Sequence, residues 1–585
     1  MYRFLFPLLA VLCLVSPPCS FAQAESHVRF ITYEEAAAKL GLTDYRYETG
    51  KQDKVVELTE PGVLDKGHTT YVLQNDVSAA KTAFVIKATD VTLDLNGHVV
   101  EYGTAGKSRC YGVTNDGYHR NNLVVANGTI RQSSAMDEKD SNLAESSPIH
   151  FAQGVDRVVL AGLTLEYHSP QTSGMFLPWS PGEIHHNVIR DKGHVVINRH
   201  QSVAAINAAR ANNLNVHSNF VERVRQSGIF PGLLKTTCKG NIVNIDSVAS
   251  NSFGIGYYGV KEGWDTWVCE DNIIRGKGVH PVGIGVVHNA AKGIIRNNDV
   301  EAMVTAWNDE YNQPIGGACY RTTWGADKIL VENNRFVYYG APDSVRGKDS
   351  WGRTIWVAIE KGQSIVFKNN VITGVSEGGG SKVPAIGVTG HNKSSGLVFI
   401  NNKVASSWAN VMLADYYGEA GGYPRFIDND FIRLKDYKDY YTIRSDANYR
   451  ISTGVFMDNR YEDGASMDST RLELSGKGVK DVLFMRPCAI QVRNGENSVP
   501  GARVVLKDKT GATVAEGATD EAGRFEARLL DHRITNRPDQ APEGIYMKTI
   551  DEAAPYTVTV ESDKGAANAT IDKGTGLAVT VDLGG

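Results

Sequence analysis

The chain has 585 residues, of which 22% are charged and 42% hydrophobic, and its formal net charge is −5. This length exceeds one ordinary core and predicts at least two domains or one elongated repeat. The small net charge gives no support to a nucleic-acid partner, which would call for a basic face.

The N-terminus has the features of a secretory signal peptide. Arg3 precedes an apolar run from Phe4 to Val15, and small residues stand at Ala22 and Ala24. The run is short of the roughly 20 residues that span a bilayer, and no later segment is apolar enough to do so. We therefore expect cleavage of residues 1–24 after Ala24, a secreted or periplasmic protein, and no membrane insertion.

Residues 25–70 are predicted to form an N-terminal cap with one short helix. The segment "TYEEAAAKLGL" offers Thr32 as the N-cap and Gly41 near the helix end. Strands follow it, as in "DVTLDLNGHVVEYG", where Val91, Leu93 and Leu95 share one face before an Asn-Gly turn. A helix in this place would cover the open edge of the first strands.

Two columns of residues then recur along the chain with one drifting period. The first column is an Asn at the end of a short apolar run, at spacings of 22 to 36: Asn187, Asn219, Asn241, Asn272, Asn298, Asn334, Asn370, Asn402, Asn429 and Asn459. The second is the central apolar residue of an intervening strand: Ile149, Met175, Ile206, Ile229, Ile255, Ile284, Tyr320, Ile355, Ile386, Val411 and Ile443. Such a period marks a solenoid, and its loose length favours short strands over helical repeats.

These columns resemble the right-handed parallel β-helix of the pectate-lyase type. The resemblance covers Tyr71 to Gly464 and implies coils of short strands with the Asn residues stacked as a ladder at one corner. We therefore predict an all-β fold in which residues 71–470 form the β-helix. Because many activities share this scaffold, the resemblance implies the fold and leaves the chemistry open.

Residues 483–585 change to an antiparallel pattern. Gly511 and Gly523 stand in hairpin turns between alternating strands. The segment resembles the carboxypeptidase regulatory-like domain, which implies a small accessory β-sandwich. Five cysteines remain after the signal peptide, with no CxxC or zinc spacing, and predict buried thiols with at most one disulfide: Cys110, Cys238, Cys269, Cys319 and Cys488.

A β-helix places residues of the same register in a straight row on its outer face, about 4.8 Å apart. The row that follows the apolar column comprises His150, Phe176, Asn207, Phe230, Gly256, Gly285, Arg321, Trp356, Gly387, Met412 and Arg444. Such a row suits a long polymer, so we predict a polysaccharide or oligosaccharide partner. The predicted substrate-binding side chains are Trp307, Trp324, Trp351, Trp356, Lys361 and His391, several of them in the longest loops.

Three functions remain open for this face. A glycoside hydrolase, which we favour for the many carboxylates and Trp residues, needs two carboxyl groups. Glu360 and Asp415 stand two coils apart, on the order of 9–10 Å, and Asp309 or Glu310 offers a replacement for either. The third function is a non-catalytic β-helix protein that binds glycan or a cell surface.

A polysaccharide lyase needs a base, a group that neutralises the uronate and an acid. These roles suit His288 or Lys361, Arg321 and Tyr258, respectively. Calcium is possible only for such a lyase, and no cofactor is otherwise predicted. Each residue also has a plainer reading: Arg321 and Glu360 suit a salt bridge between coils, and Trp356 suits packing beneath a loop.

A histidine-rich segment invites a metal interpretation. It contains His185, His186, His194 and His200, but their spacing matches no zinc motif, so no metal site is predicted. The protein is expected to be a monomer.

Overall fold

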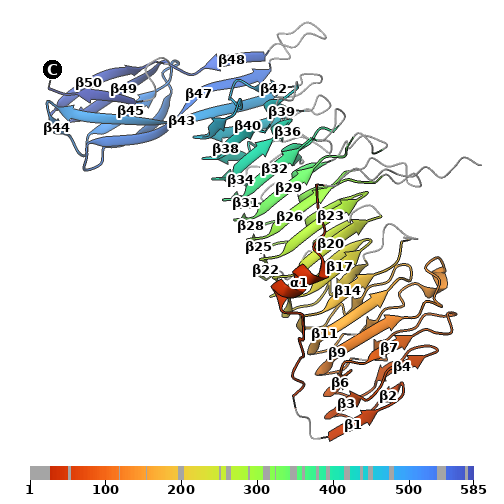
Figure 1. Ribbon diagram of the computed structural model, residues 1–585. Coiled ribbons are helices and arrows are strands. Elements are labelled where there is room, and N and C mark those ends of the chain that lie inside the picture. Colours follow the sequence, from red (N-terminus) through yellow and green to blue (C-terminus); the bar gives the residue numbers. More distant parts are fainter. Residues whose placement is uncertain are drawn as a thin grey trace, which may run out of the picture.

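The computed structural model describes most of the chain after residue 26. The described residues are 27–50, 54–116, 119–152, 154–194, 203–232, 234–248, 252–258, 265–287, 290–306, 316–322, 325–342, 345, 352–358, 363–376, 381–389, 396–413, 422–434, 439–445, 452–472, 480–536, 548–572 and 578–584. The predicted signal peptide lies outside them. Figure 1 shows a tall column of stacked strands with a smaller β unit at one end.

The column is a right-handed parallel β-helix, as predicted, and its strands form three rows. Sheet 1 contains β2 (Gly62–Leu64), β5 (Phe84–Ile86), β8 (Val113–Thr114), β10 (Ile149–His150), β12 (Met175–Phe176), β15 (Ala204–Asn207), β18 (Ser227–Phe230), β21 (Ser252–Tyr258), β24 (Pro281–Val287), β27 (Ala318–Thr322), β30 (Arg353–Ala358), β33 (Pro384–Thr389), β36 (Ala409–Leu413), β39 (Tyr441–Ser445) and β42 (Thr470–Leu472). The pectate-lyase type within this fold stays a prediction.

The other two rows meet at the Asn corner. Sheet 2 contains β1 (Lys54–Leu58), β3 (Thr69–Leu73), β6 (Val91–Asp94), β9 (Leu123–Gln132), β11 (Val158–Tyr167), β13 (Gly182–His185), β16 (Leu214–His217), β19 (Thr237–Lys239), β22 (Trp267–Glu270), β25 (Gly293–Arg296), β28 (Ile329–Glu332), β31 (Ile365–Lys368), β34 (Leu397–Ile400), β37 (Arg425–Ile427), β40 (Ser452–Met457) and β43 (Lys480–Asn494). Sheet 3 contains β4 (Val77–Ala79), β7 (Val99–Tyr102), β14 (Val188–Asp191), β17 (Phe220–Val224), β20 (Ile242–Ser247), β23 (Ile273–Gly278), β26 (Asp299–Met303), β29 (Arg335–Tyr339), β32 (Val371–Val375), β35 (Lys403–Ser406), β38 (Asp430–Arg433) and β41 (Arg460–Glu462). The long strands β9 and β11 belong to both rows.

The predicted Asn corners form a continuous hydrogen-bonded ladder. The side-chain amide of Asn298 donates to Oδ1 of Asn334 at 2.9 Å and accepts from the amide of Asn272 at 2.9 Å. The same side-chain bond joins every neighbouring pair of the ten residues. The residue before each ladder Asn has a positive φ, 56° at Asn297, because the chain turns there from sheet 2 into sheet 3.

The inward column of sheet 1 stacks in the predicted register. Ile255 pairs with Ile284, Ile284 with Tyr320, and Tyr320 with Ile355. All four side chains are completely buried. The residue that follows each of them in the chain therefore points outward, and the predicted outer row is fixed with it.

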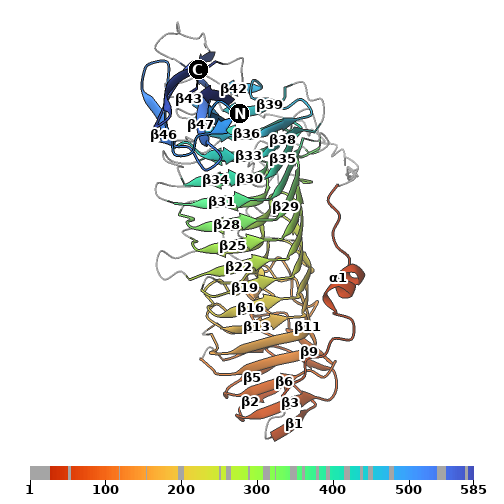
Figure 2. The ribbon, with the colours of Figure 1, turned by 90° about the vertical axis from the view of Figure 1, so that its left-hand side faces the viewer.

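The N-terminal helix forms where expected but does not cap the column. Helix α1 (Tyr33–Leu40) begins at Thr32, in a capping box with Glu35, and ends at Gly41. It packs on the side of the column against the outward apolar side chains of sheet 3, Val188, Phe220 and Ile242 (Figures 1 and 2). The predicted cap over 25–70 is therefore wrong in position, because β1 and β2 already belong to the first coil.

The C-terminal unit continues directly from the column through one strand. β43 pairs with β40 of the last coil in parallel and with β47 (Arg524–Asn536) in antiparallel fashion. β44 (Asn497–Ser498), β48 (Lys548–Glu552) and β51 (Ala578–Asp582) complete this layer. A second sheet contains β45 (Arg503–Lys507), β46 (Thr513–Ala518), β49 (Tyr556–Ser562) and β50 (Gly565–Ile571).

These two layers enclose a separate apolar core, which includes Ile490, Leu506 and Val558. β47 also covers the final edge of the column, where His532 stacks on Phe484 with ring centroids 4.5 Å apart. The unit therefore closes the strand edge that the last coil would otherwise expose. Its membership of the carboxypeptidase regulatory-like family stays a prediction.

The five predicted free cysteines are all buried and unpaired in disulfides: Cys110, Cys238, Cys269, Cys319 and Cys488. Burial raises the pKa of each thiol, to about 11 for Cys110, which keeps these groups protonated. The described part of the chain contains no helix long and apolar enough to cross a membrane.

Candidate functional site

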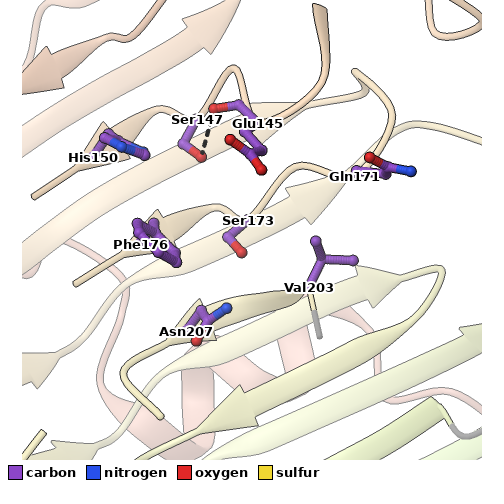
Figure 3. A pocket seen from close by; sticks show the side chains of 8 residues that line it. All are labelled: Glu145, Ser147, His150, Gln171, Ser173, Phe176, Val203 and Asn207. Atoms are coloured by element: carbon purple, nitrogen blue, oxygen red, sulfur yellow. Dashed lines mark hydrogen bonds between the residues drawn. The ribbon is translucent and has the colours of Figure 1, made fainter. Parts of the chain in front are cut away.

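A pocket of about 210 Å³ opens on the outer face of sheet 1, near the N-terminal third of the column (Figure 3). Its base is the first part of the predicted outer row, with one residue from each of β10, β12 and β15. These are His150, Phe176 and Asn207. The walls come from the segments that precede those strands and contribute Glu145, Ser147, Gln171, Ser173 and Val203.

His150 is the central aromatic group of the pocket. Its ring stacks between Tyr111, with centroids 4.1 Å apart, and Phe176, with centroids 5.0 Å apart. Burial, assisted by the nearby charge of Arg109, lowers the pKa of His150 to about 4, so the imidazole is neutral at pH 7. Its buried Nδ1 has no hydrogen-bond partner among the described residues, a condition that costs free energy until a partner is supplied.

One rim of the pocket carries charge. Glu145 forms an ion pair of 2.9 Å with Arg109, and its backbone has a positive φ of 64°. Arg109 also donates from Nε to the carbonyl of Ala144 at 2.9 Å, which fixes the guanidinium beside the pocket. Glu145 is the only carboxylate among the eight lining residues.

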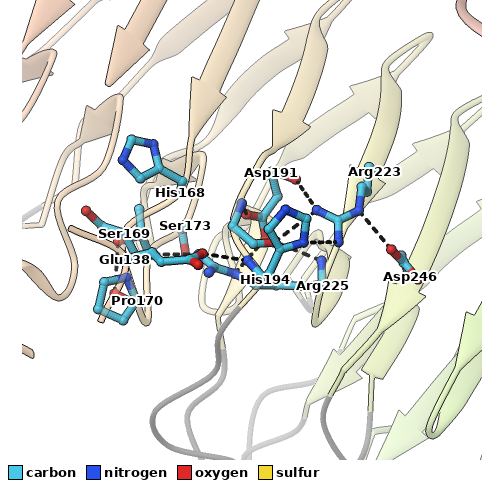
Figure 4. Close-up of polar contacts among 12 residues, drawn as sticks. Glu138, His168, Ser169, Pro170, Ser173, Asp191, His194, Arg223, Arg225 and Asp246 are labelled. Carbon is cyan, nitrogen blue, oxygen red and sulfur yellow. Dashed lines mark hydrogen bonds and ion pairs between the residues drawn. The ribbon is translucent and has the colours of Figure 1, made fainter. Parts of the chain in front are cut away.

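A buried ion pair supports the segment that leads to Ser173 of the pocket (Figure 4). Asp191 and Arg225 lie 3.0 Å apart, with side chains only 3% and 4% exposed. Arg225 also donates to the carbonyl of Ser169, in the segment that leads to Ser173 of the pocket. The Asp191 carboxylate accepts from the backbone amide of Gly193 at 3.1 Å. Burial raises the pKa of Asp191, and the Arg225 charge opposes that shift.

Three of the predicted site residues lie in the described part of the chain, namely Tyr258, Arg321 and Trp356. Two of these three are in register. Arg321 and Trp356 pair across β27 and β30, and the guanidinium lies 4.6 Å from the ring centroid. Arg353 approaches the same ring at 5.8 Å, and the side chain of Trp356 is 3% exposed. The assignment of Trp356 as a sugar-stacking surface is therefore corrected, because its ring is covered and supports the two guanidinium groups.

Tyr258 lies in an aromatic cluster two coils before Arg321. It makes edge-to-face contacts with Phe230 and Phe253 at 5.1 and 5.7 Å. Burial raises the pKa of Tyr258, opposed by the charge of Arg321, so the phenol stays protonated. The positions of Arg321 and Tyr258 agree with the predicted outer face, and their catalytic roles stay predictions.

His280 is a titratable group near this cluster that sequence reasoning missed. Burial and the charge of Arg321 lower its pKa to about 3, so its imidazole is neutral. Its backbone amide donates to Ser247 Oγ at 3.1 Å. His280 stands directly before β24, outside the strand positions from which the outer row was built, so strand alternation gave no signal for it.

The other ten predicted site residues lie outside the described residues, and their assignments stay predictions. They are His288, Trp307, Asp309, Glu310, Trp324, Trp351, Glu360, Lys361, His391 and Asp415. The pocket walls were also missed, since they come from connecting segments whose course no periodic pattern predicts. The predicted outer row contains His150, Phe176 and Asn207, although the sequence predicts no site role for them.

Comparisons with known proteins find similarity in architecture alone. No family model and no curated protein matches the chain. Among solved structures, it is similar to the tailspike protein of E. coli bacteriophage HK620 in complex with a pentasaccharide, at 10% identity over 85% of each chain with a TM-score of 0.37. A variant of that tailspike with a hexasaccharide aligns with 83% of this chain and 85% of its own at 10% identity and a TM-score of 0.36. Likeness at this level carries no statement about activity.

Proposed function

We propose that the protein binds a polysaccharide along the outer face of sheet 1, with one sugar unit in the pocket at His150. The observation that carries this proposal is the chemistry of the pocket. Stacked rings of His150 and Phe176 lie beside the amide of Asn207 and the hydroxyl groups of Ser147 and Ser173. Rings contact the apolar faces of a sugar, while amides and hydroxyls bind its hydroxyl groups.

The unpartnered nitrogen of His150 gives the pocket a reason to bind a hydroxyl group. A sugar hydroxyl can donate to Nδ1 or accept from it, and either bond removes the cost of a buried polar atom without a partner. The volume of about 210 Å³ is below the roughly 300–1,000 Å³ of pockets for drug-sized ligands. It therefore suits one ring of a longer chain, whose remaining units extend over the neighbouring strands.

The same face offers a positive group further along the column. Arg321 stands four strand steps beyond Asn207, through β18, β21 and β24 to β27. At about 4.8 Å per step this separation is about 19 Å. A chain bound at the pocket and extended along the column would reach Arg321, which favours an acidic polysaccharide over a neutral one.

A second candidate function is cleavage of that polysaccharide by β-elimination. The observation that favours it is the position of Tyr258 and Arg321 on the same outer face, two coils apart. Arg321 is a cation suited to a uronate carboxylate, and Tyr258 keeps its proton because burial raises its pKa. The base would be His288 or Lys361, as predicted from the sequence. Calcium would be needed only if Arg321 did not suffice for that charge.

Hydrolysis rests on residues outside the described part of the chain. A glycosidase needs two carboxyl groups on either side of the scissile bond, and Glu145 is the only carboxylate among the residues that line the pocket. The predicted pair Glu360 and Asp415 would have to supply the reaction over the central coils. Hydrolysis therefore stays a prediction beside elimination, and the reaction products decide between them.

A panel of polysaccharides tests both proposals. Isothermal titration is expected to detect binding, and the variants Asn207→Ala and His150→Phe should each weaken it at least about tenfold, since each loses a buried polar contact. Asn215→Ala, on the outer face of β16 in sheet 2, is the matched control and should bind normally. Equal affinity in all four proteins would exclude the pocket.

The products separate the enzymatic alternatives. An unsaturated uronyl product, seen by its ultraviolet absorbance, indicates elimination, and new reducing ends without that absorbance indicate hydrolysis. Binding without either product leaves a glycan-binding protein. The proposal also includes secretion through the signal peptide of residues 1–24. It further includes a monomeric state and an accessory role for the C-terminal unit.

A further inference from the structure

A group of histidines lies on sheet 2, on a different face from the pocket. His185 and Glu183 project from the same face of β13, two residues apart, and His217 is the register partner of His185 on β16. One ligand atom from each of the three side chains lies within 4.8 Å of the others. The strand pairing therefore brings together residues that are 34 positions apart at most in the sequence.

The hydrogen bonds of the two imidazoles leave the same ring atom available on each. Nδ1 of His185 lies 3.0 Å from Nδ1 of His186 and 3.3 Å from the hydroxyl of Tyr45. Nδ1 of His217 lies 3.4 Å from Ser218 Oγ. With Nδ1 engaged in both rings, Nε2 is the atom left for a ligand, and Nε2 of His185 lies 3.8 Å from Glu183 Oε2. Metal-bound histidines use their second nitrogen in this way.

The side chains around the cluster hold the two rings in place. His185 and His217 stack with centroids 4.8 Å apart and planes within 7°. Tyr45 stacks on His186 at 4.0 Å, and Tyr47 packs against His185 at 5.8 Å. Both tyrosines belong to the N-terminal segment that runs along the side of the column (Figure 2). Glu183 is the most exposed of the three ligands, with 54% of its side chain accessible, and is free to adjust.

We propose that Glu183, His185 and His217 bind one zinc ion on the outer face of sheet 2. Two imidazole nitrogens and one carboxylate form the three-ligand set that leaves the fourth tetrahedral position of zinc to water. Imidazole ligands favour zinc and other late first-row metals over calcium or magnesium, which prefer oxygen donors. Bonds of about 2.0–2.2 Å would bring the ligand atoms to about 3.4 Å from one another. This needs Glu183 to move inward and the partly exposed His217 ring to tilt out of its stack with His185.

The site differs from the metal hypothesis that the sequence raised and rejected. That hypothesis considered the four histidines of one segment, whose spacing fits no zinc motif. The structure instead joins His185 of that segment to His217, one coil further along. The site is also independent of the polysaccharide proposal, since it uses a different sheet.

Binding of zinc would fasten the N-terminal segment as well as the three ligands. Tyr45 contacts His185 and His186 directly, and the backbone of Tyr47 exchanges two hydrogen bonds with the side chain of Asn127, at 2.7 and 3.0 Å. Fixing the imidazoles therefore fixes the surface on which residues 45–47 lie. Zinc should slow proteolytic cleavage of this segment.

The test is titration of zinc chloride into tag-free, metal-stripped full-length protein, followed by calorimetry and by the melting temperature. One equivalent should bind, with a rise in melting temperature, and His217→Gln and Glu183→Gln should each weaken binding at least about tenfold. Cobalt(II) should give the visible absorption of a tetrahedral site in the wild type and lose it in both variants. His119→Gln, an exposed histidine that lies 2.6 Å from Asp156, is the matched control.

Both variants replace groups that are at least partly exposed, so their folding is expected to be normal, and circular dichroism checks it. The proposal is overturned if the wild type binds no zinc, or if zinc binds as tightly to folded His217→Gln as to the wild type. Failure of this test leaves the polysaccharide proposal intact, because no pocket residue is altered.

Discussion

The Asn corner and the outer face of sheet 1 are both straight rows of residues in register, yet they differ in composition. At the corner, ten coils use the same residue, and each amide bonds to the next. On the outer face the residue changes almost every coil, from His150 through Phe176 and Asn207 to Arg321. Repetition thus accompanies a bond that every coil needs, whereas the residues vary on the face that we propose to bind the polysaccharide.

The physical reason lies in the direction of the bonds. A ladder amide is buried and must satisfy its donors and acceptors with the coils above and below, so one residue type serves every position. An outward side chain can bond to water instead, so the fold does not require one residue type at that position. Both the pocket at His150 and the guanidinium group over Trp356 are formed by side chains of this variable outer face.

The largest expected loss of stability lies outside both rows, at the buried ion pair of Asp191 and Arg225. Arg225→Met leaves the Asp191 carboxylate buried without its partner, and we expect a loss of about 3–5 kcal/mol in the free energy of unfolding. Denaturant titration measures it. The double variant Asp191→Leu/Arg225→Met should recover most of the loss, and a double variant as unstable as the single one would contradict this account.

The ladder gives the next largest effect. Asn298→Ala removes the acceptor of the Asn272 backbone and side-chain amides and leaves them buried. We expect a loss of about 2–4 kcal/mol. The control is Asn297→Gly, at the exposed neighbouring position with positive φ, which glycine adopts without strain, so a change within about 0.5 kcal/mol is expected. Similar losses in the two variants would show that the turn, rather than the amide bond, makes the corner.

Acid should also destabilise the fold, through two partly buried histidines. The pKa of His150 is lowered to about 4 and that of His280 to about 3, from an ordinary value of 6.5. The unfolded chain therefore binds more protons between these values, so their stabilising contribution is complete above about pH 6.5 and is lost as the pH falls toward 4 and then 3.

Melting temperatures measured from pH 7 to pH 4 test this expectation. They should fall across the interval, and His280→Gln should show a shallower fall than the wild type. A flat profile in the wild type would mean that these imidazoles are protonated in the folded protein.

Much of the fold could be predicted because the same two residue patterns recur in each coil. The Asn and Ile columns gave both the corner and the register, and alternation along each strand then gave the outer row. The helix at Tyr33–Leu40 followed from its caps. Its position did not, because the apolar patch of Val188, Phe220 and Ile242 that receives it comes from three separate coils.

The candidate site was less predictable because most of it lies outside the repeat. Its walls, among them Glu145 and Gln171, lie in segments that follow no period, and their approach to His150 depends on the path of each connection. The histidine pair of His185 and His217 becomes visible only once the register of β13 and β16 is known. Burial of Trp356 likewise depends on two arginines that come from different strands.

The most direct test measures stability and polysaccharide affinity together in two variants, Asn298→Ala in the ladder and Phe176→Ala in the outer row. We expect the ladder variant to lose stability and, below its melting temperature, to keep its affinity. The outer-row variant should keep most of its stability and lose affinity at least about tenfold, with the stacked ring gone. If Asn298→Ala lost affinity while Phe176→Ala kept it, the division between a structural row and a binding row would be wrong.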